Sequence, residues 1–515
     1  MKTKKETGAL GSLRNQGISK MIVNSAICLA TALVTLVTTG CEKNNNGGND
    51  NGGGSQNEQQ ILFNGNEIGN GNQEFKVTGN HIIKKGTYIL KGWVYVTDGS
   101  VLTIEPGTVI KGDIQTKAAI IVERGGKIMA QGSVSEPIIF TSNQVVGSRK
   151  PGDWGGIILC GKARNNKTEM IIEGGPGTPH GGNDDSDNSG ILSYVRIEFA
   201  GYPFNTDQEI NGLTLGSVGK GTKIDHIQVS YSNDDSYEWF GGCVNAKYLI
   251  AYHGWDDDFD TDNGFSGKLQ FLLSVRNPKL ADVSVSNGFE SDNEANGTAI
   301  TPITSPVFSN LTVVGPISSA TDFENTTAYI NGGVYNPNNG SKLGQFQSAI
   351  QIRRSSQLNC YNSLFTGFPV GIIIENDKGS QTQEAATVGK LSIKNIVFAQ
   401  MGILGSDQNK SFKNLFTNNA QIADGETRES FSAGFFKTAA FGNIANATFS
   451  SLALDANYAP QAGSILLGKS NLFTDSKLSD PFFEQVNYIG AFKSNSTTDN
   501  WAAGWTNFDP QNTNY

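Results

Sequence analysis

Short strand-like segments recur along the chain from about residue 80, and they constrain its fold more than any other feature. Segments such as TYILKGWVYV, AAIIVERGGKIMAQG and GGIILCGK are rich in β-branched residues, too short for helices, and bounded by turn residues. Three turns align on the glycines Gly241, Gly264 and Gly288, with spacings of 23 and 24 residues. The neighbouring strands align as well, so that AKYLIAYH falls on LQFLLSVR at a shift of 23.

A repeat of this length that contains strands and no helices predicts a solenoid, most simply a parallel β-helix. Equivalent residues of successive coils then lie above one another at the strand spacing of ~4.8 Å. One coil cannot bury its inward face alone, so we expect apolar columns such as Ile227, Ile250 and Leu273. The composition agrees with an all-β fold, because 62 of the 515 residues are Gly and only 37% are hydrophobic.

The first 60 residues lie outside this pattern. Basic residues precede an apolar stretch from Met21 to Val37, and small residues stand directly before Cys41. This order is typical of a secretory signal, and it resembles a bacterial lipobox in which Cys41 is acylated and becomes the mature N-terminus. Thr31, Thr35 and the Gly-Cys ending argue against the alternative, a membrane-spanning anchor.

Four segments are therefore predicted. Residues 1–40 form a lipoprotein signal peptide, and residues 41–60 form the lipidated cysteine with a flexible Gly- and Asn-rich tether. Residues 61–495 form the β-helix, with NYIGAF as its last coil. Residues 496–515 form a C-terminal cap, in which Trp501, Trp505 and Phe508 cover the open end of the solenoid.

Charge and cysteine content narrow the range of partners. The formal net charge is −9, and loss of residues 1–40 makes it about −13, which disfavours nucleic acid as a partner. Cys160, Cys243 and Cys360 are far apart in the sequence and odd in number, so we expect buried free thiols rather than a disulfide framework.

Several longer motifs, among them IEPGTVIKG, GDWGGIILCG, EINGLTLGSVGKGT and DDSYEWFGGCVNAKYLIAY, resemble those of a bacterial protein family. The chain is similar, from about residue 80 onward, to pectin-lyase-like right-handed parallel β-helix surface lipoproteins of diderm bacteria. The resemblance implies a right-handed β-helix with terminal caps. It also implies an outer-membrane, cell-surface location through the lipid anchor. It implies no reaction, because no activity is established for that family.

Acidic turns are the main candidate site. The stretch DDDFDTDNGF, residues 256–265, follows a coil that already carries Asp235. Stacked carboxylates repel one another, and Ca²⁺ takes six to eight oxygen ligands of this kind. We predict possible-ligand status for five acids in a Ca²⁺ site: Asp235, Asp256, Asp258, Asp260 and Asp262. The alternative, that these acids are solvated or paired with Lys247, Lys268 and Arg276, stays open.

Aromatic residues stand beside the acidic turns. Tyr237, Trp239 and Trp255 are candidate ligand-binding residues, because flat apolar rings stack on sugar rings. The alternative for each ring is packing inside the fold.

The function expected from these features is binding rather than catalysis. The four His residues form no zinc motif, and no complete catalytic set stands in the sequence. The leading hypothesis is a non-enzymatic surface lipoprotein whose β-helix binds an extracellular ligand, a glycan, with Ca²⁺. One alternative is a polysaccharide lyase or glycoside hydrolase acting along the acidic turns. Another is a structural or adhesive accessory subunit of a nutrient importer.

Overall fold

The computed structural model describes residues 59–167, 170–205, 208–337, 339–379, 381–410 and 429–515. The predicted signal peptide, the lipidation site Cys41 and residues 42–58 of the predicted tether lie outside these ranges. The last two tether residues, Gln59 and Gln60, already form the first strand and pair with the strand at Asn80–Ile83.

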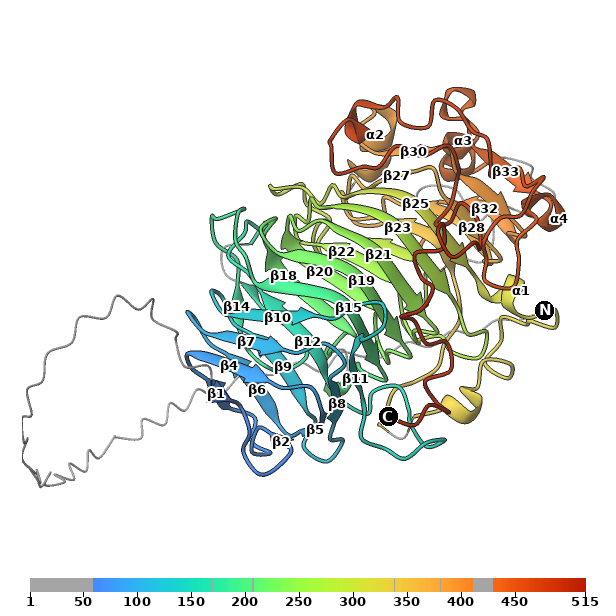
Figure 1. The fold of residues 1–515 in the computed structure, drawn as a ribbon. Coiled ribbons are helices and arrows are strands. Elements are labelled where there is room, and N and C mark those ends of the chain that lie inside the picture. Colours follow the sequence, from blue (N-terminus) through green and yellow to red (C-terminus); the bar gives the residue numbers. More distant parts are fainter. Residues whose placement is uncertain (1–58, 168–169, 206–207, 338, 380, 411–428) are drawn as a thin grey trace, which may run out of the picture. The chain divides into compact units, whose positions relative to one another are not determined.

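Two large sheets, whose strands all run parallel, form the body of the molecule (Figure 1). The smaller sheet has eleven strands: β3 (Phe75–Val77), β6 (Trp93–Val96), β9 (Ala119–Val122), β12 (Gly156–Cys160), β18 (Leu213–Val218), β20 (Tyr237–Gly242), β22 (Phe259–Asp262), β24 (Phe289–Ser291), β26 (Ser348–Ile352), β29 (Val370–Ile374) and β32 (Ile403–Ser406).

The larger sheet has eighteen strands: β1 (Gln59–Gln60), β2 (Glu67–Ile68), β4 (Asn80–Ile83), β5 (Thr87–Leu90), β7 (Val101–Ile104), β8 (Val109–Gly112), β10 (Lys127–Gln131), β11 (Ile138–Ser142), β15 (Gly190–Glu198), β19 (Lys223–Ser230), β21 (Ala246–Tyr252), β23 (Lys268–Val275), β25 (Val307–Val314), β27 (Asn359–Tyr361), β28 (Leu364–Thr366), β30 (Ser392–Lys394), β31 (Val397–Ala399) and β33 (Ile444–Ala447).

The eighteen-stranded sheet consists of two columns of strands that fuse in the middle of the molecule. The short strands β10 and β11 both pair with the single long strand β15, and β27 and β28 both pair with β25. A residue with positive φ bends each long strand where the two columns meet, at Tyr194, His226, Tyr248, Phe271 and Asn310. Each coil therefore presents three faces, two from this sheet and one from the eleven-stranded sheet. This stacking confirms the predicted all-β, parallel β-helix fold.

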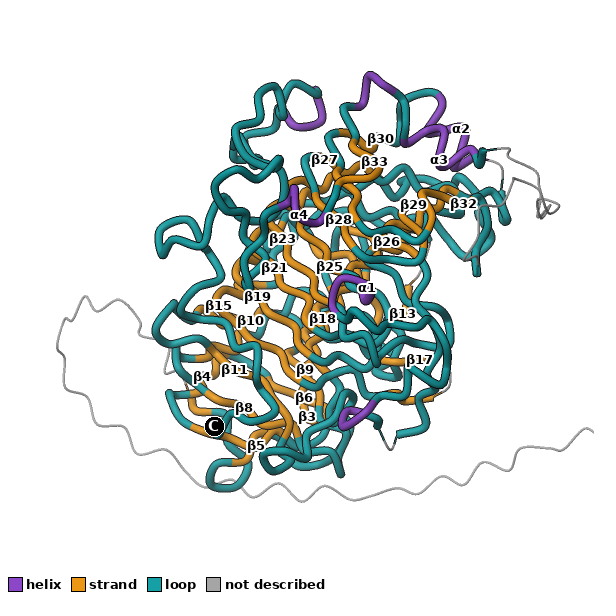
Figure 2. The backbone as a smooth tube through the Cα atoms, turned by 90° about the vertical axis from the view of Figure 1, so that its right-hand side faces the viewer, coloured by secondary structure: helices purple, strands orange, loops and turns teal. Residues whose placement is uncertain are grey.

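The remaining elements are short. Two antiparallel hairpins leave the coils: β13 (Met170–Ile171) with β14 (Pro179–His180), and β16 (Pro203–Asn205) with β17 (Gln208–Glu209). The helical segments are α1 (Pro316–Ser319), η1 (Gly333–Tyr335), α2 (Gln381–Thr387), α3 (Phe431–Phe436), η2 (Ala439–Phe441), α4 (Phe449–Leu452) and η3 (Ser476–Leu478). The longest of these, α2 and α3, lie beside the last coils (Figure 2). Within the described ranges, no helix is long and apolar enough to cross a membrane.

The core is built from columns of inward side chains, but its register differs from the predicted one. Ile227 pairs with Leu249, and Leu249 pairs with Leu272; all three are buried in the central core. Ile250 pairs with Leu273, as the shift of 23 predicts, and these two point outward instead. The step from β19 to β21 is one residue shorter than the next step, and a one-residue slip moves a side chain to the opposite face.

The predicted file of glycines is wrong for the same reason. Phe240 pairs with Asp262, which puts Gly241 level with Asn263 rather than with Gly264. Phe259 pairs with Phe289, which puts Gly288 level with Asp258, at the opposite end of the strand. Insertions of different length between strands change the repeat from one coil to the next.

The predicted C-terminal cap is also wrong in its position. Trp505 packs with Ile250, Leu273 and Val275 on the outer face of the middle coils, and the chain then returns toward β8 and β11 (Figure 1). NYIGAF forms no coil of the helix; Gly490 donates its N–H to the carbonyl of Asn362 on that same outer face. The last residues therefore cover a side of the β-helix, because the eighteen-stranded sheet carries an apolar outer strip that needs burial.

Candidate functional site

The acidic residues gather on the outer face of the eleven-stranded sheet and on the turns that lead into it. Side chains alternate along β20, so that Tyr237 and Trp239 point into the core while Glu238 points outward. The pairing of β20, β22 and β24 stacks Glu238, Asp260 and Glu290 on successive coils. Parallel register thus converts an ordinary alternating pattern into a ladder of carboxylates.

These carboxylates line a cavity of about 660 Å³, which we call the acidic pocket. The β16–β17 hairpin region contributes two aromatic rings, Tyr202 and Phe204, and the loop around residues 339–342 forms another wall. Two of the lining residues are cations, Lys342 and Arg353. Ten of them are acidic: Glu173, Glu209, Asp234, Asp235, Glu238, Asp256, Asp257, Asp260, Asp282 and Glu290.

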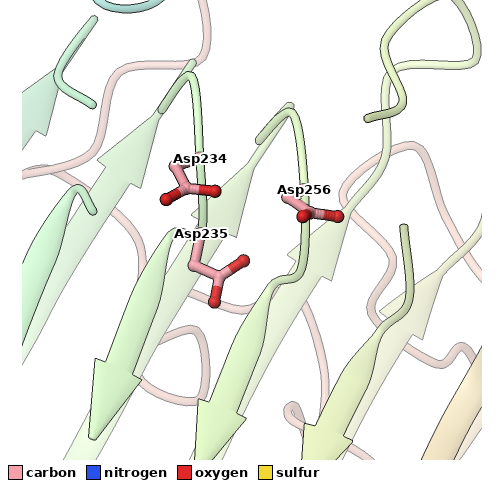
Figure 3. A group of neighbouring side chains, drawn as sticks. All are labelled: Asp234, Asp235 and Asp256. Atoms are coloured by element: carbon pink, nitrogen blue, oxygen red, sulfur yellow. The ribbon is translucent and has the colours of Figure 1, made fainter. Parts of the chain in front are cut away.

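Two groups of three carboxylates within this pocket are spaced to share a cation. Asp234, Asp235 and Asp256 each offer an oxygen within 4.8 Å of the others, and they face one another across two neighbouring turns (Figure 3). Asp235, Glu238 and Asp260 form a second group of the same size. Asp235 belongs to both, and its Oδ1 already accepts the backbone N–H of Asp257 at 2.7 Å. The shared carboxylate would bridge two adjacent cation positions.

The electrostatics of the two groups call for added positive charge. Burial, followed by repulsion from neighbouring carboxylates, raises the pKa of Asp234, Asp235 and Asp260 well above the usual range. Asp256 Oδ1 and Asp260 Oδ1 are buried and accept no hydrogen bond from any described residue. Either protons or a bound cation must therefore neutralise this part of the pocket.

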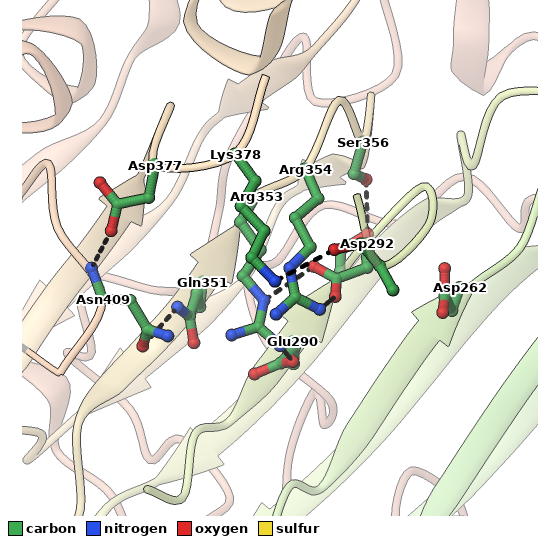
Figure 4. A network of polar contacts seen from close by, with 12 residues as sticks. Asp262, Glu290, Asp292, Gln351, Arg353, Arg354, Ser356, Asp377, Lys378 and Asn409 are labelled. Atoms are coloured by element: carbon green, nitrogen blue, oxygen red, sulfur yellow. Dashed lines mark hydrogen bonds and ion pairs between the residues drawn. The ribbon is translucent and has the colours of Figure 1, made fainter. Parts of the chain in front are cut away.

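The coils beyond the two groups carry their own cations. Arg353 pairs with Glu290, and also with Asp292 at 2.8 Å, while Arg354 reaches the other oxygen of Asp292 at 2.5 Å (Figure 4). Asp262 lies beside this network (Figure 4). The arginines neutralise the ladder at Glu290 and Asp292, and this leaves Asp234–Asp260 as the part that lacks compensation.

Of the five predicted metal ligands, the structure brings three together. Asp235, Asp256 and Asp260 line the acidic pocket, whereas Asp258 and Asp262 are not among its lining residues. Asp258 is fully buried in an ion pair with Arg276 at 2.9 Å, and it also accepts the hydroxyl hydrogen of Ser274. Its structural role is a correction to the prediction, and it matches the alternative of pairing with Arg276.

The pairing alternative is wrong for the pocket itself. Lys247 pairs with Glu484 and Lys268 with Asp480, both in contacts of the eighteen-stranded sheet. Glu173 and Glu209, by contrast, were not predicted for the pocket, because both belong to the long insertion between β12 and β18. No repeat spacing could reveal them.

The predicted sugar-stacking residues are core residues. Tyr237, Trp239 and Trp255 are all 0% exposed, and the Tyr237 hydroxyl donates to backbone carbonyls inside the helix. Trp255 packs under a loop and donates its ring N–H to Asp282 at 3.1 Å. Rings without an exposed face cannot stack on a ligand, so the prediction is corrected. Tyr202 and Phe204 are the partly exposed rings of the pocket.

Stacked parallel strands with three faces per coil define the class of parallel β-helix proteins. Within this class, the model of the pectate-lyase-like β-helix domain matches residues 76–506, and the chain belongs to that family. No curated protein and no solved structure matched the chain.

Proposed function

We propose that this protein binds a glycan in the acidic pocket and that Ca²⁺ held by the pocket carboxylates takes part in the binding. The observation that carries the proposal is the pair of three-carboxylate groups centred on Asp235. Hard cations such as Ca²⁺ prefer oxygen ligands in flexible arrangements, and carboxylates of this density supply them.

The unsatisfied oxygens support a cation in particular. Asp256 Oδ1 and Asp260 Oδ1 have no hydrogen-bond donor among the described residues, although each belongs to one of the two groups. A divalent ion bound between the groups would satisfy these oxygens and remove the mutual repulsion of the carboxylates at the same time.

The shape of the pocket supports a sugar ligand. Its volume of about 660 Å³ falls in the range of pockets for organic ligands, and Tyr202 and Phe204 offer partly exposed apolar rings at one wall. Carboxylates accept strong hydrogen bonds from sugar hydroxyls, and a bound Ca²⁺ can coordinate hydroxyl oxygens directly.

The proposal includes attachment to the bacterial outer membrane through an acylated Cys41, facing the outside of the cell. The lipobox-like sequence before Cys41 supports it, although this segment lies outside the described residues. A surface glycan-binding protein of this kind would pass its ligand to a nutrient importer, and an importer complex is the partner that we propose.

An enzyme acting on the same glycan is the second candidate. Burial and the neighbouring Glu173 and Asp260 raise the pKa of Glu238 well above its usual range. Burial also raises the pKa of Asp257, but hydrogen bonds from Asn287 limit the rise to about 6. A protonated carboxyl close to an ionised one is the pair that glycoside hydrolysis requires. Release of reducing ends from a polysaccharide would establish this activity, and unsaturated uronates would indicate a lyase.

The test of the proposal is Ca²⁺ titration by calorimetry, together with retention on a panel of immobilised polysaccharides. We expect saturable Ca²⁺ binding, and we expect Asp235→Asn to weaken it at least ten-fold because Asp235 belongs to both carboxylate groups. Asp98→Asn removes a well-exposed carboxylate elsewhere and should leave Ca²⁺ binding unchanged. Equal Ca²⁺ binding by the wild type and the Asp235→Asn variant would contradict the proposal.

A further inference from the structure

A second cavity of about 880 Å³ has the opposite charge to the acidic pocket, and we call it the basic pocket. Arg124, Arg164 and Lys167 line it together with His180, and its described lining contains no carboxylate. Arg164 is already paired with Asp185, so its uncompensated positive charge comes from Arg124 and Lys167.

One hairpin contributes to both pockets. Met170 and Ile171 of β13, and Pro179 and His180 of β14, line the basic pocket. Glu173, in the segment that connects the two strands, lines the acidic pocket. The two pockets therefore adjoin the same short element, which places sites of opposite charge within reach of one extended ligand.

His180 is held firmly in the wall of the basic pocket. Its side chain is only 3% exposed, and Nδ1 lies 2.9 Å from the hydroxyl oxygen of Ser217. The ring lies over Gly216, where a Cβ atom would stand 2.7 Å from Cγ of His180. Nε2, in contrast, is buried without a hydrogen-bond partner in the described part of the chain.

The contacts of Ser217 determine which ring nitrogen carries the hydrogen. Ser217 Oγ accepts a hydrogen bond from the side chain of Asn165 at 2.9 Å, so its single hydrogen is available for one acceptor. His180 Nδ1 at 2.9 Å is a better acceptor than the Phe240 carbonyl at 3.4 Å. Burial, with the charges of Arg124 and Lys167, lowers the pKa of His180 to about 3, so the ring is neutral. Its one hydrogen is therefore on Nε2, which is a donor without an acceptor.

We propose that the basic pocket binds an oxyanion group of the ligand, a sulfate ester or a carboxylate, which accepts the hydrogen bond of His180 Nε2–H beside Arg124 and Lys167. A buried donor without a partner costs free energy, and an anionic oxygen satisfies it best. The two exposed cations attract the anion and orient it. The identification of the ligand as an acidic glycan rests on the proposed function, whereas the oxyanion site does not.

The test uses the full mature chain in calcium-free buffer, with sodium sulfate and sodium glucuronate as separate probes in calorimetry. We expect saturable binding of at least one probe, and the probe that binds more tightly identifies the group. The double variant Arg124→Gln/Lys167→Gln changes exposed side chains only, and it should weaken binding at least ten-fold. Lys162→Gln, an exposed residue outside the lining, is the matched control. No saturable binding of either probe, or binding unchanged in the double variant, would overturn the inference.

A second measurement addresses His180 directly. ¹⁵N NMR of the imidazole should show hydrogen on Nε2 at neutral pH, and the Nε2–H resonance should shift on addition of the bound probe. Hydrogen on Nδ1 would overturn the assignment of Nε2 as the donor. The Asp235→Asn variant should keep the oxyanion affinity while it loses Ca²⁺, so failure of this inference and failure of the proposed function can be distinguished.

Discussion

Single residues show how the same side-chain type takes opposite roles a few positions apart. Asp257 and Asp258 are neighbours, yet Asp257 lines the acidic pocket while Asp258 faces Arg276 inside the fold. The sequence predicted that acids gather here, but it could not predict which acid faces inward, because strand entry, not residue type, decides the direction of each side chain. Tyr237 and Trp239 were misassigned for the same reason.

The ion pair of Asp258 with Arg276 gives a prediction about stability. Both side chains are fully buried, so Arg276→Ala leaves a buried carboxylate without its partner and should lower the free energy of unfolding by about 3–5 kcal/mol. The midpoint of urea unfolding, followed by circular dichroism, measures this loss. Asp258→Asn/Arg276→Met removes both charges and should recover most of it. Equal midpoints for Arg276→Ala and the wild type would show that the pair is unimportant.

At the scale of elements, the eleven-stranded sheet concentrates charge because its strands stack in register. Glu238, Asp260 and Glu290 come from three coils separated by 22 and 30 residues, and only strand pairing reveals that they are neighbours. The general place of the candidate site, at the turns near Asp235 and Asp256, could be predicted from the sequence. Glu173 and the aromatic rings Tyr202 and Phe204 could not, because irregular insertions position them.

The carboxylates of this sheet predict an unusual dependence of stability on pH. An acid whose pKa is higher in the folded state binds more protons there, so its stabilising effect is present at low pH and is lost as pH rises through the folded pKa. For Asp257 this window runs from its ordinary pKa of 3.8 to about 6. Without Ca²⁺, the melting temperature should therefore be higher near pH 5 than near pH 8.

Calcium is the control for that dependence. Saturating Ca²⁺ at pH 8 should raise the melting temperature, because ligand binding to the folded state stabilises it and replaces the missing protons. The Asp235→Asn variant should gain less from Ca²⁺ than the wild type. A melting temperature that rises from pH 5 to pH 8 without Ca²⁺ would contradict the account of the acidic pocket.

At the scale of the whole molecule, the C-terminal segment ties distant parts of the β-helix together. Trp505 packs against strands of the middle coils, Gln511 accepts the backbone N–H of Arg149, and Tyr515 donates its hydroxyl hydrogen to Glu198 at 2.6 Å. The aromatic residues of this segment predicted that it covers apolar surface. Only the structure decides that the covered surface is a side and not an end.

Removal of this segment should therefore destabilise the middle of the β-helix. A chain that ends at Asn495 exposes Ile250, Leu273 and Val275, and the loss of Trp505 alone should cost about 3–5 kcal/mol. Thermal unfolding together with binding of a hydrophobic dye measures the effect. Trp505→Phe keeps most of the apolar contact and should retain most of the stability. An unchanged melting temperature after truncation would mean that the segment adds no stability.

The sequence by itself determined that this chain is a parallel β-helix with a strongly acidic set of turns, because both properties depend on short-range patterns repeated many times. Register, direction of side chains and the second, basic pocket were decided only by the tertiary structure. The physical reason is that coil lengths vary between 22 residues and many more, and each added residue moves the following side chains to another face. His180 shows this most clearly, since the fold of its hairpin alone leaves its Nε2 buried without a partner.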